Sequence, residues 1–107
     1  MKVYIAGKVT GNPNYVDEFF FASAFYKALG HIVLNPATLP DGMDTADYMR
    51  ICLPMLFTAD CVVLLPSWKE SKGAKIEKEL AAYIGIGTIF AENDPGFMRL
   101  WSNAHEP

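Results

Sequence analysis

The chain has 107 residues, which corresponds to one domain near the lower end of the usual size range. Hydrophobic residues make up 51% of it, enough for a buried core and too many for a disordered chain. The formal net charge of −3 gives no broad basic surface, so we expect no duplex nucleic acid partner. A local group of backbone amides can still bind a small anion.

Cysteine content and local hydrophobicity indicate the compartment in which the protein is expected. Cys52 and Cys61 are the only two cysteines and form no CxxC pair, so we expect free thiols in a reducing compartment and no metal site. Segment 1–7 becomes polar too soon for a signal peptide, and no apolar run approaches the roughly 20 residues that span a bilayer. The sequence therefore predicts a cytoplasmic protein without a membrane partner or a cofactor.

The first third of the chain alternates strand and helix patterns. Residues 3–6 form a short apolar run rich in β-formers, which predicts a buried strand, and a loop over 7–14 follows. Asn14 is placed to cap a helix, and Gly30 is placed to end it. Residues 32–34 then predict a second strand.

A long loop over 35–44 precedes a second predicted helix. Either Asp44 or Thr45 can cap this helix at its start. Pro54 lies inside it, and because an interior proline removes one backbone hydrogen bond, we expect a bend there.

The remaining elements repeat the alternation. Residues 61–65 are the clearest buried strand, and a polar loop over 66–72 follows. A third helix is predicted from about 73–83 and a fourth strand over 88–91. Residues 97–101 suit a short last helix.

Strands that alternate with helices predict βαβ units joined by right-handed crossovers. We expect a single domain over residues 1–107, with a Rossmann- or flavodoxin-like three-layer α/β fold and a sheet of four to five parallel strands. In such sheets ligands bind outside the carboxyl ends of the strands. Loops 7–14, 35–44 and 66–72 all leave those ends, so a binding site is predicted among them.

The first of these loops has the composition of an anion site. Gly7 and Gly11 allow backbone amides to approach a ligand. Lys8 offers a positive charge and Thr10 a hydroxyl, just ahead of a helix N-terminus. The pattern is neither a Walker loop nor GxGxxG, so an ordinary turn with a solvated lysine explains it equally well.

The third loop enters its helix with a hydroxyl and a carboxylate. Ser71 can cap the helix, Gly73 follows, and Glu77 lies about one turn inside. Glu77 and Glu79 flank the apolar stripe of this helix on opposite sides, so helix geometry leaves open whether Glu77 is functional or solvated. The stripe consists of Ile76, Leu80, Tyr83 and Ile84.

Three segments of the chain form a set. They are Tyr4-Ile5-Ala6-Gly7, Ala59-Asp60-Cys61-Val62-Val63-Leu64-Leu65 and Ser71…Gly73…Glu77. In this order and at this spacing they resemble the nucleoside 2-deoxyribosyltransferase family, over residues 2–91. The resemblance is closest to the family's short phage and bacterial members, which are related to 2′-deoxynucleoside 5′-phosphate N-hydrolases.

The resemblance implies a mechanism. In that family the residue in the Glu77 position attacks the anomeric carbon of a deoxyribosyl group, and water or a second base then releases the sugar. A serine in the Ser71 position is typical of members that hydrolyse nucleoside 5′-monophosphates, whereas the deoxyribosyltransferases carry an aspartate there. Tyr4 matches a tyrosine that orients the attacking carboxylate, and its alternative role is that of an ordinary buried aromatic.

These features together predict an N-glycosidase or deoxyribosyltransferase that acts on a (deoxy)nucleoside 5′-monophosphate. Glu77 and Tyr4 are the expected catalytic residues. The expected substrate-binding residues are Gly7, Lys8, Thr10, Gly11, Ser71 and Gly73.

One position departs from the family pattern. The family's second catalytic carboxylate corresponds to Cys52, and a thiol does not replace an acid directly. Asp44 and Asp47 are alternative acids one to two turns earlier, while Asp60 is better explained as a cap at the start of the following strand. A non-catalytic nucleotide-binding module with a degenerate site is therefore the main alternative, and a small interaction protein is the third.

Members of the family often complete their sites across a dimer interface, which implies a homodimer or higher homo-oligomer. Trp68 and the run over residues 19–21 suit base stacking or subunit packing, and packing is the preferred reading. Candidates in the tail for completing a partner's site are Asn93, Asp94, Trp101 and Asn103.

Overall fold

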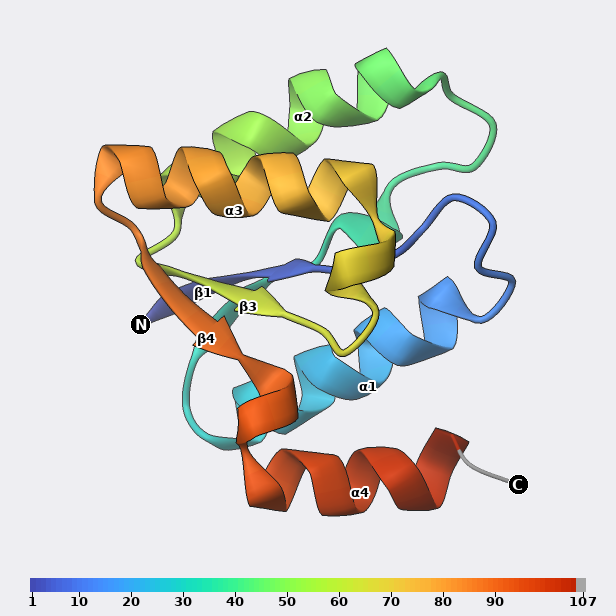
Figure 1. Ribbon diagram of the computed structural model, residues 1–107, viewed down its shortest axis with the longest axis vertical. Helices are drawn as coiled ribbons and strands as arrows, with labels where there is room; N and C mark the ends of the chain where they lie inside the picture. The colour runs from blue at the N-terminus through green and yellow to red at the C-terminus, as the bar shows by residue number, and fades with distance from the viewer. Residues whose placement is uncertain (106–107) are drawn as a thin grey trace.

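The protein folds as a four-stranded parallel sheet with helices on both faces (Figure 1). The computed structural model describes residues 1–105. The short 3₁₀ helices are η1 (Pro36–Thr38), η2 (Trp68–Glu70) and η3 (Ala91–Asn93). The longer elements are β1 (Lys2–Ala6), α1 (Tyr15–Ala28), β2 (Ile32–Leu34), α2 (Thr45–Thr58), β3 (Cys61–Leu64), α3 (Lys72–Ile84), β4 (Gly87–Phe90) and α4 (Pro95–His105).

The strand order is β2-β1-β3-β4, and every neighbouring pair is parallel. The chain moves outward from β1 to β2, then crosses back over β1 to β3, so the winding direction reverses between β1 and β3. Such a reversal opens a crevice at the carboxyl ends of the two strands. The predicted three-layer α/β fold is confirmed, with four strands.

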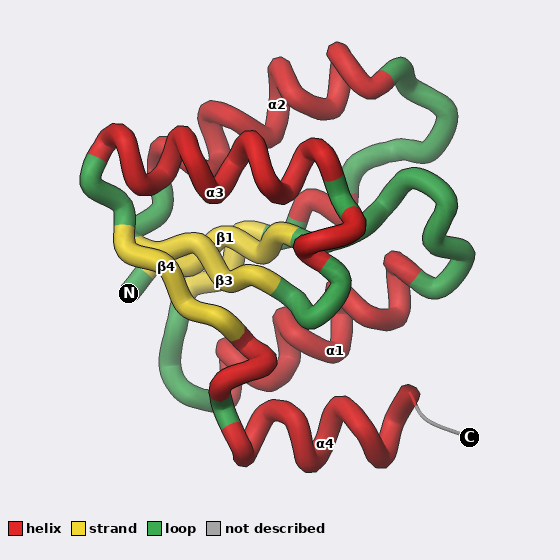
Figure 2. Tube along the Cα trace, in the orientation of Figure 1, coloured by secondary structure: helices red, strands yellow, loops and turns green. Residues whose placement is uncertain are grey.

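The helices form two layers. Helices α2 and α3 cover one face of the sheet, and α1 and α4 cover the other (Figure 2). Between them β1 and β3 are almost completely buried, with Val3, Ile5 and Val63 each 0% exposed. No helix within residues 1–105 is long and apolar enough to cross a membrane.

Helix α1 begins and ends where the sequence predicts, but the predicted capping hydrogen bond at its start is not formed. Gly30 adopts a φ of +91° just after the helix, and its amide bonds the carbonyl of Lys27, so the predicted glycine stop is confirmed. Asn14 occupies the N-cap position but its side chain makes no capping hydrogen bond. Asn12 organises this turn instead, because its Oδ1 accepts from the Asn14 amide and its Nδ2 donates to Glu18.

Helix α2 runs through Pro54 without a break. The proline lies on the exposed side of the helix, as does Arg50, whose carbonyl loses its intrahelical partner. Water can solvate that carbonyl, so the proline does not split the helix. Asp44 stands at the N-cap position, but its side chain makes no capping bond.

Helix α3 reverses the expected orientation of its apolar stripe. Its buried residues are Ala74, Glu77 and Ala81, whereas Tyr83 is 90% exposed and Ile76 40% exposed. Two alanines on the inner face allow the helix to pack close to the sheet, and the larger apolar side chains are left outside. Three of the four stripe residues, Ile76, Tyr83 and Ile84, are therefore exposed and Leu80 is half-buried, while Glu77 belongs to the inner face of α3.

The predicted last helix is α4, which packs on the same side of the sheet as α1. Trp101 stacks on Phe97 at a centroid distance of 5.5 Å and meets Phe21 edge-on at 5.7 Å. Asp94 caps the helix, since its Oδ1 accepts from the amides of Gly96 and Phe97. Two of the four tail candidates, Asp94 and Trp101, thus have structural roles within their own chain.

Candidate functional site

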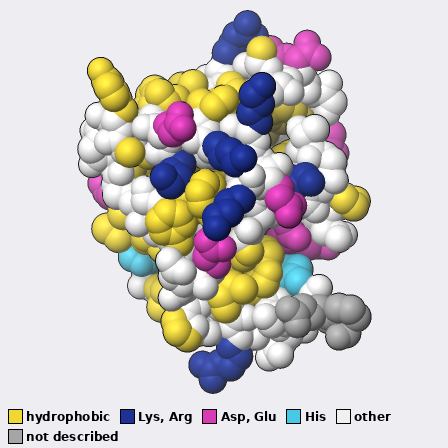
Figure 3. All heavy atoms as spheres, in the orientation of Figure 1, with side chains coloured by type: hydrophobic (Ala, Val, Ile, Leu, Met, Phe, Trp, Pro, Cys, Tyr) yellow, Lys and Arg dark blue, Asp and Glu magenta, His cyan; other side chains and the backbone are white. Residues whose placement is uncertain are grey.

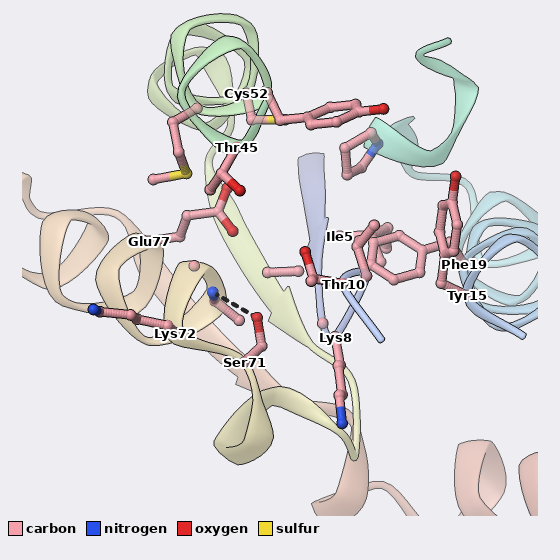
Figure 4. A pocket seen from close by; sticks show the side chains of 18 of the residues that line it. Ile5, Lys8, Thr10, Tyr15, Phe19, Thr45, Cys52, Ser71, Lys72 and Glu77 are labelled. Atoms are coloured by element: carbon pink, nitrogen blue, oxygen red, sulfur yellow. Dashed lines mark hydrogen bonds between the residues drawn. The ribbon is translucent and has the colours of Figure 1, made fainter. Parts of the chain in front are cut away.

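A cavity of about 470 Å³ opens beyond the carboxyl end of β1, beside the point where the strand order reverses (Figure 4). Residues from all three predicted loops line it, including Lys8, Leu39 and Ser71. Its volume falls within the range of about 300–1,000 Å³ that is typical of small-molecule sites. The cavity lies among the three loops where the sequence predicts a binding site, and its occupation by a ligand stays a prediction.

Glu77 points from α3 into this cavity (Figure 4) and is only 6% exposed. Ala74 and Ala81, on the same face of the helix, keep the helix close to the sheet and bring the carboxylate against β1. Burial disfavours the charged form and raises the pKa of Glu77 to about 7, opposed in part by a hydrogen bond from Tyr4. At neutral pH this carboxyl group is therefore poised between its two protonation states.

Tyr4 is the hydrogen-bond partner of Glu77. Side chains alternate along β1, so Val3 and Ile5 pack toward α1 while Tyr4 packs toward α2 and α3. The Tyr4 hydroxyl donates to Oε2 of Glu77 over 2.5 Å. Burial and then the charge of Glu77 raise the pKa of Tyr4, so the phenol keeps its proton and acts as a donor. This bond uses one carboxylate oxygen, and within residues 1–105 no side chain bonds the other.

Cys52 lies in the cavity beside this pair, on α2. Burial raises the pKa of its thiol, so the group is neutral at neutral pH. Neither Asp44 nor Asp47 lines the cavity, and Asp47 instead bonds Arg50 at 2.9 Å. Two carboxylates line the cavity within residues 1–105: Glu77 is buried, whereas Glu70 is exposed and pairs with Lys8. A thiol, Cys52, stands where the resemblance places a second acid.

Ser71 caps α3 as predicted, since its Oγ accepts from the Ala74 amide at 3.1 Å. Because this oxygen serves as an acceptor, its own hydroxyl proton is left to donate to a ligand. Ser71 and Gly73 both line the cavity, at the end of α3 where free amides and the helix dipole favour an anion.

The loop over residues 7–14 contacts the loop over residues 66–72 through Lys8. Lys8 donates its amide to Oγ of Ser67 at 3.0 Å, and its Nζ lies 3.8 Å from Oε2 of Glu70. A Cβ on Gly7 would lie 3.1 Å from that of Leu65, so glycine is needed where β1 leaves the sheet.

The predicted binding residues of the first loop divide into two groups. Gly7, Lys8 and Thr10 line the cavity, but Gly11 does not. Gly11 has a φ of +75°, which fits the conformation of a turn rather than contact with the cavity. The expectation of a contact at Gly11 is therefore not met.

An aromatic wall faces Glu77, and of its members only Phe19 belongs to the run over residues 19–21 that the sequence offered for base stacking or packing. Tyr15 and Phe19 lie on the opposite side of the cavity (Figure 4). The Tyr15 hydroxyl donates to Asp41 at 2.6 Å, and that hydrogen bond is the main reason why the pKa of Tyr15 rises to about 12. The Tyr48 hydroxyl likewise donates to the Pro40 carbonyl at 2.6 Å. Tyr15 begins α1 and Tyr48 lies in the first turn of α2, so both follow predicted site loops, which was the signal available in the sequence.

The aromatic candidates named from the sequence lie in different surroundings. Trp68 packs against Phe90 at a centroid distance of 5.7 Å. The run of three phenylalanines reaches three environments, because Phe19 lines the cavity, Phe20 is 47% exposed and Phe21 packs on α4. No group of three or more His, Cys, Asp or Glu side chains in the described part of the chain could hold a metal ion. The expected homo-oligomer stays a prediction.

Comparison with known proteins gives one match. Residues 1–90 match the model of a family described as "Domain of unknown function (DUF4406)". The matched segment contains all four strands and every residue that lines the cavity, whereas α4 lies beyond it. No curated protein and no solved structure matches the chain.

Proposed function

The chain belongs to the DUF4406 family, and we propose that it cleaves the N-glycosidic bond of (deoxy)nucleoside 5′-monophosphates with Glu77 as the nucleophile. The observation that carries this proposal is the buried hydrogen bond between Tyr4 and Glu77 at the floor of a cavity of nucleotide size. The resemblance to nucleoside 2-deoxyribosyltransferases points to the same two residues. A membrane-independent, cytoplasmic setting is part of the proposal.

The first chemical step uses the free carboxylate oxygen. Tyr4 holds Oε2 of Glu77, which leaves Oε1 directed at the anomeric carbon of a bound sugar. Attack by Oε1 forms a C–O bond while the C–N bond breaks, and the base leaves with the bonding electrons and takes a proton from solvent. Because only the ionised carboxylate attacks, activity should rise as the pH increases through about 7.

The second step releases the sugar. Water attacks the anomeric carbon and loses a proton to solvent, the bond to Glu77 breaks with its electrons returning to the carboxylate, and the product is a deoxyribose 5-phosphate. If a second base attacks in place of water, the same intermediate gives a transferase. The Tyr4 hydroxyl stays protonated throughout and stabilises the departing carboxylate by the same hydrogen bond.

The two ends of the cavity suit the two ends of a nucleotide. Ser71 and Lys8, with the first-turn amides of α3, offer donors and positive charge to a 5′-phosphate. Tyr15, Phe19 and Tyr48 offer an apolar wall for the base. The sugar then lies between them, next to Glu77.

A second candidate function is a nucleotide-binding module without catalysis. Cys52 favours it, because a neutral thiol stands beside Tyr4 and Glu77 where nucleoside 2-deoxyribosyltransferases have their second acid. The other carboxylate that lines the cavity, Glu70, is exposed and already pairs with Lys8. This candidate keeps the cavity, the phosphate end and the aromatic wall.

The experiment that separates the two candidates is incubation of the protein with a panel of nucleoside and deoxynucleoside 5′-monophosphates, followed by mass spectrometry of the small molecules. The native protein is compared with Glu77→Gln, which keeps the size and hydrogen-bonding capacity of the side chain but cannot attack. Glu79→Gln is the matched control, since Glu79 is an exposed glutamate on the same helix.

Release of free base by the native protein and by Glu79→Gln, but not by Glu77→Gln, supports the glycosidase. Binding of nucleotide without release of base from any compound refutes the enzyme and supports the binding module. Nucleosides without a 5′-phosphate should react at least about tenfold more slowly, because each charge-assisted hydrogen bond to the phosphate contributes about 1.5–3 kcal/mol.

A further inference from the structure

Four lysines lie close together on the surface of η2 and α3, and we call them the lysine row. Lysine side chains gather over these elements in the middle of the face shown in Figure 3. They account for four of the nine Lys and Arg residues of the chain, which otherwise carries net negative charge. The members are Lys69, Lys72, Lys75 and Lys78.

The row is not neutralised by ion pairs. Within residues 1–105 the ion pairs involve Lys2, Lys8 and Arg50, and none involves a member of the row. Glu79 lies among these lysines without pairing with them, and Glu70 pairs with Lys8. No ion pair within the described residues therefore takes up the charge of these four ammonium groups, and it is available to a ligand.

The row begins at the cavity and leads away from it. Lys72 lines the cavity rim, and its side chain extends away from Ser71 along the outside of α3 (Figure 4). Lys75 and Lys78 follow on the same helix, and Lys78 lies about 9 Å farther along the helix axis than Lys72.

The far end of the row surrounds an aromatic ring. Nζ of Lys69 and Nζ of Lys78 each lie 5.8 Å from the ring centroid of Trp68. Trp68 is partly exposed, and its indole nitrogen lies 3.4 Å from Glu92. Positive charge next to an aromatic face is the combination that binds phosphate chains and unpaired bases.

We propose that the lysine row binds phosphates beyond the 5′-phosphate of the nucleotide in the cavity, so that the ligand carries a phosphate chain that leaves through the rim at Lys72. Lysine ammonium groups are mobile point charges that suit successive phosphates without strict geometry. The inference rests on the proposed function for the position of the first phosphate. Such a chain occurs in a nucleoside 5′-triphosphate and at the 3′-terminal nucleotide of a single strand.

Tryptophan fluorescence gives a direct readout. Trp68 lies in the row, and the half-buried Trp101 packs against the core on the opposite face of the sheet, so a Trp101→Phe background isolates the signal of Trp68. Titrations use a deoxynucleoside 5′-monophosphate, the matching 5′-triphosphate and a 12-residue oligodeoxythymidylate (about the site size of one single-strand module), with Glu77→Gln added to prevent cleavage.

The triphosphate or the oligonucleotide should bind about tenfold more tightly than the monophosphate, since two exposed charge pairs contribute up to about 1 kcal/mol each. Lys75→Gln/Lys78→Gln should abolish this advantage while changing monophosphate affinity less than about twofold. For the oligonucleotide, the double variant should also reduce the slope of log affinity against log salt concentration by about 1.4. The matched control Lys27→Gln/Arg99→Gln removes two exposed charges from α1 and α4, and it should change neither quantity.

A gain for the triphosphate alone identifies a free nucleotide as the ligand, and a gain for the oligonucleotide identifies a strand end. Equal affinity for all three probes, or the same loss in the control variant, overturns the proposal. The readout is binding, so it is separate from the proposed chemistry. Base release without any phosphate-chain advantage refutes the lysine row alone, and the advantage without base release refutes the glycosidase alone.

Discussion

The two faces of the sheet bury different types of side chain. The face covered by α1 and α4 is closed by large aromatic side chains that contact one another. The face covered by α2 and α3 buries mainly aliphatic side chains and alanines, and it holds a carboxylate, a phenol and a thiol within the cavity wall. The aromatic set is Phe19, Phe21, Phe25, Tyr26, Phe97 and Trp101, and the opposing set is Tyr4, Ala6, Cys52, Leu56, Ala59, Val62, Leu64, Ala74, Glu77 and Ala81.

We relate this difference to two roles, with one face contributing stability and the other carrying the candidate reactive groups. Burial of aromatic area is the largest source of stability available to a small domain. Burial of a carboxylate opposes stability, because the ionised form is disfavoured away from water. We infer that the aromatic face stabilises the fold. The opposite face keeps Glu77 buried, with a raised pKa, for its function.

The largest effect is expected on the aromatic face. Phe97 is 0% exposed, and Phe97→Ala should lower the free energy of unfolding by about 3–5 kcal/mol through lost burial and a residual cavity. Urea denaturation followed by circular dichroism measures this change. If Phe97→Ala does not fold, Phe97→Leu should show a smaller loss, and in either variant the folded fraction should release base at the native rate.

On the opposite face, Glu77→Gln should stabilise the protein at high pH. The pKa of Glu77 is raised from 4.5 to about 7 in the folded state. Stability associated with this group is fully present below pH 4.5 and lost as the pH rises through 7, because folding then requires a buried charge. The variant should therefore gain about 2–3 kcal/mol over the native protein at pH 8 and nothing at pH 4.

Thermal unfolding at both pH values tests this comparison. The control Glu79→Gln changes an exposed carboxylate and should show the same stability as the native protein at each pH. A loss of stability in Glu77→Gln at pH 8 would contradict the view that the buried, ionised carboxylate lowers the free energy of unfolding.

Tyr4→Phe should lower the rate of base release by about 10- to 100-fold, which corresponds to about 1.4–2.7 kcal/mol. The hydrogen bond from Tyr4 lowers the pKa of Glu77, so its removal should also move the rising limb of the pH–rate profile to higher pH. Steady-state kinetics across pH 5–9 checks both effects. A rate loss without a shift of the profile would indicate a structural role only.

The smallest effect is expected at the second buried tyrosine. Tyr26 lies on the aromatic face, is 3% exposed, and its hydroxyl has no hydrogen-bond partner among residues 1–105. Tyr26→Phe should therefore change the free energy of unfolding by less than about 0.5 kcal/mol and should leave activity unchanged. Parallel assays of Tyr26→Phe and Tyr4→Phe compare the same chemical change on the two faces.

The sequence was sufficient for the elements and the place of the site. Short apolar runs and glycine stops such as Gly30 act locally, so the order of strands and helices follows from them. The three loops converge because parallel strands share a carboxyl edge. Ser71 was identified as a cap for the same reason, since capping depends on neighbours within one turn.

The orientation of α3 was not predictable in this way. Its apolar stripe suggested the wrong inner face, because the close approach of the helix to the sheet depends on Ala74 and Ala81 together with the residues of β1 and β3. The same applies to the bond between Tyr15 and Asp41, which joins residues 26 positions apart. Contacts between distant segments decide these features, and no local pattern encodes them.

Trapping of a covalent glycosyl-enzyme tests the central claim most directly. The protein is mixed with a reactive deoxynucleoside 5′-monophosphate, quenched in acid within the first turnovers, and analysed by peptide mass spectrometry. We predict a mass increase of one deoxyribose phosphate on the peptide that contains Glu77, absent in Glu77→Gln and present in Glu79→Gln. Base release without an adduct, or an adduct on any other residue, would contradict the assignment of Glu77 as the nucleophile.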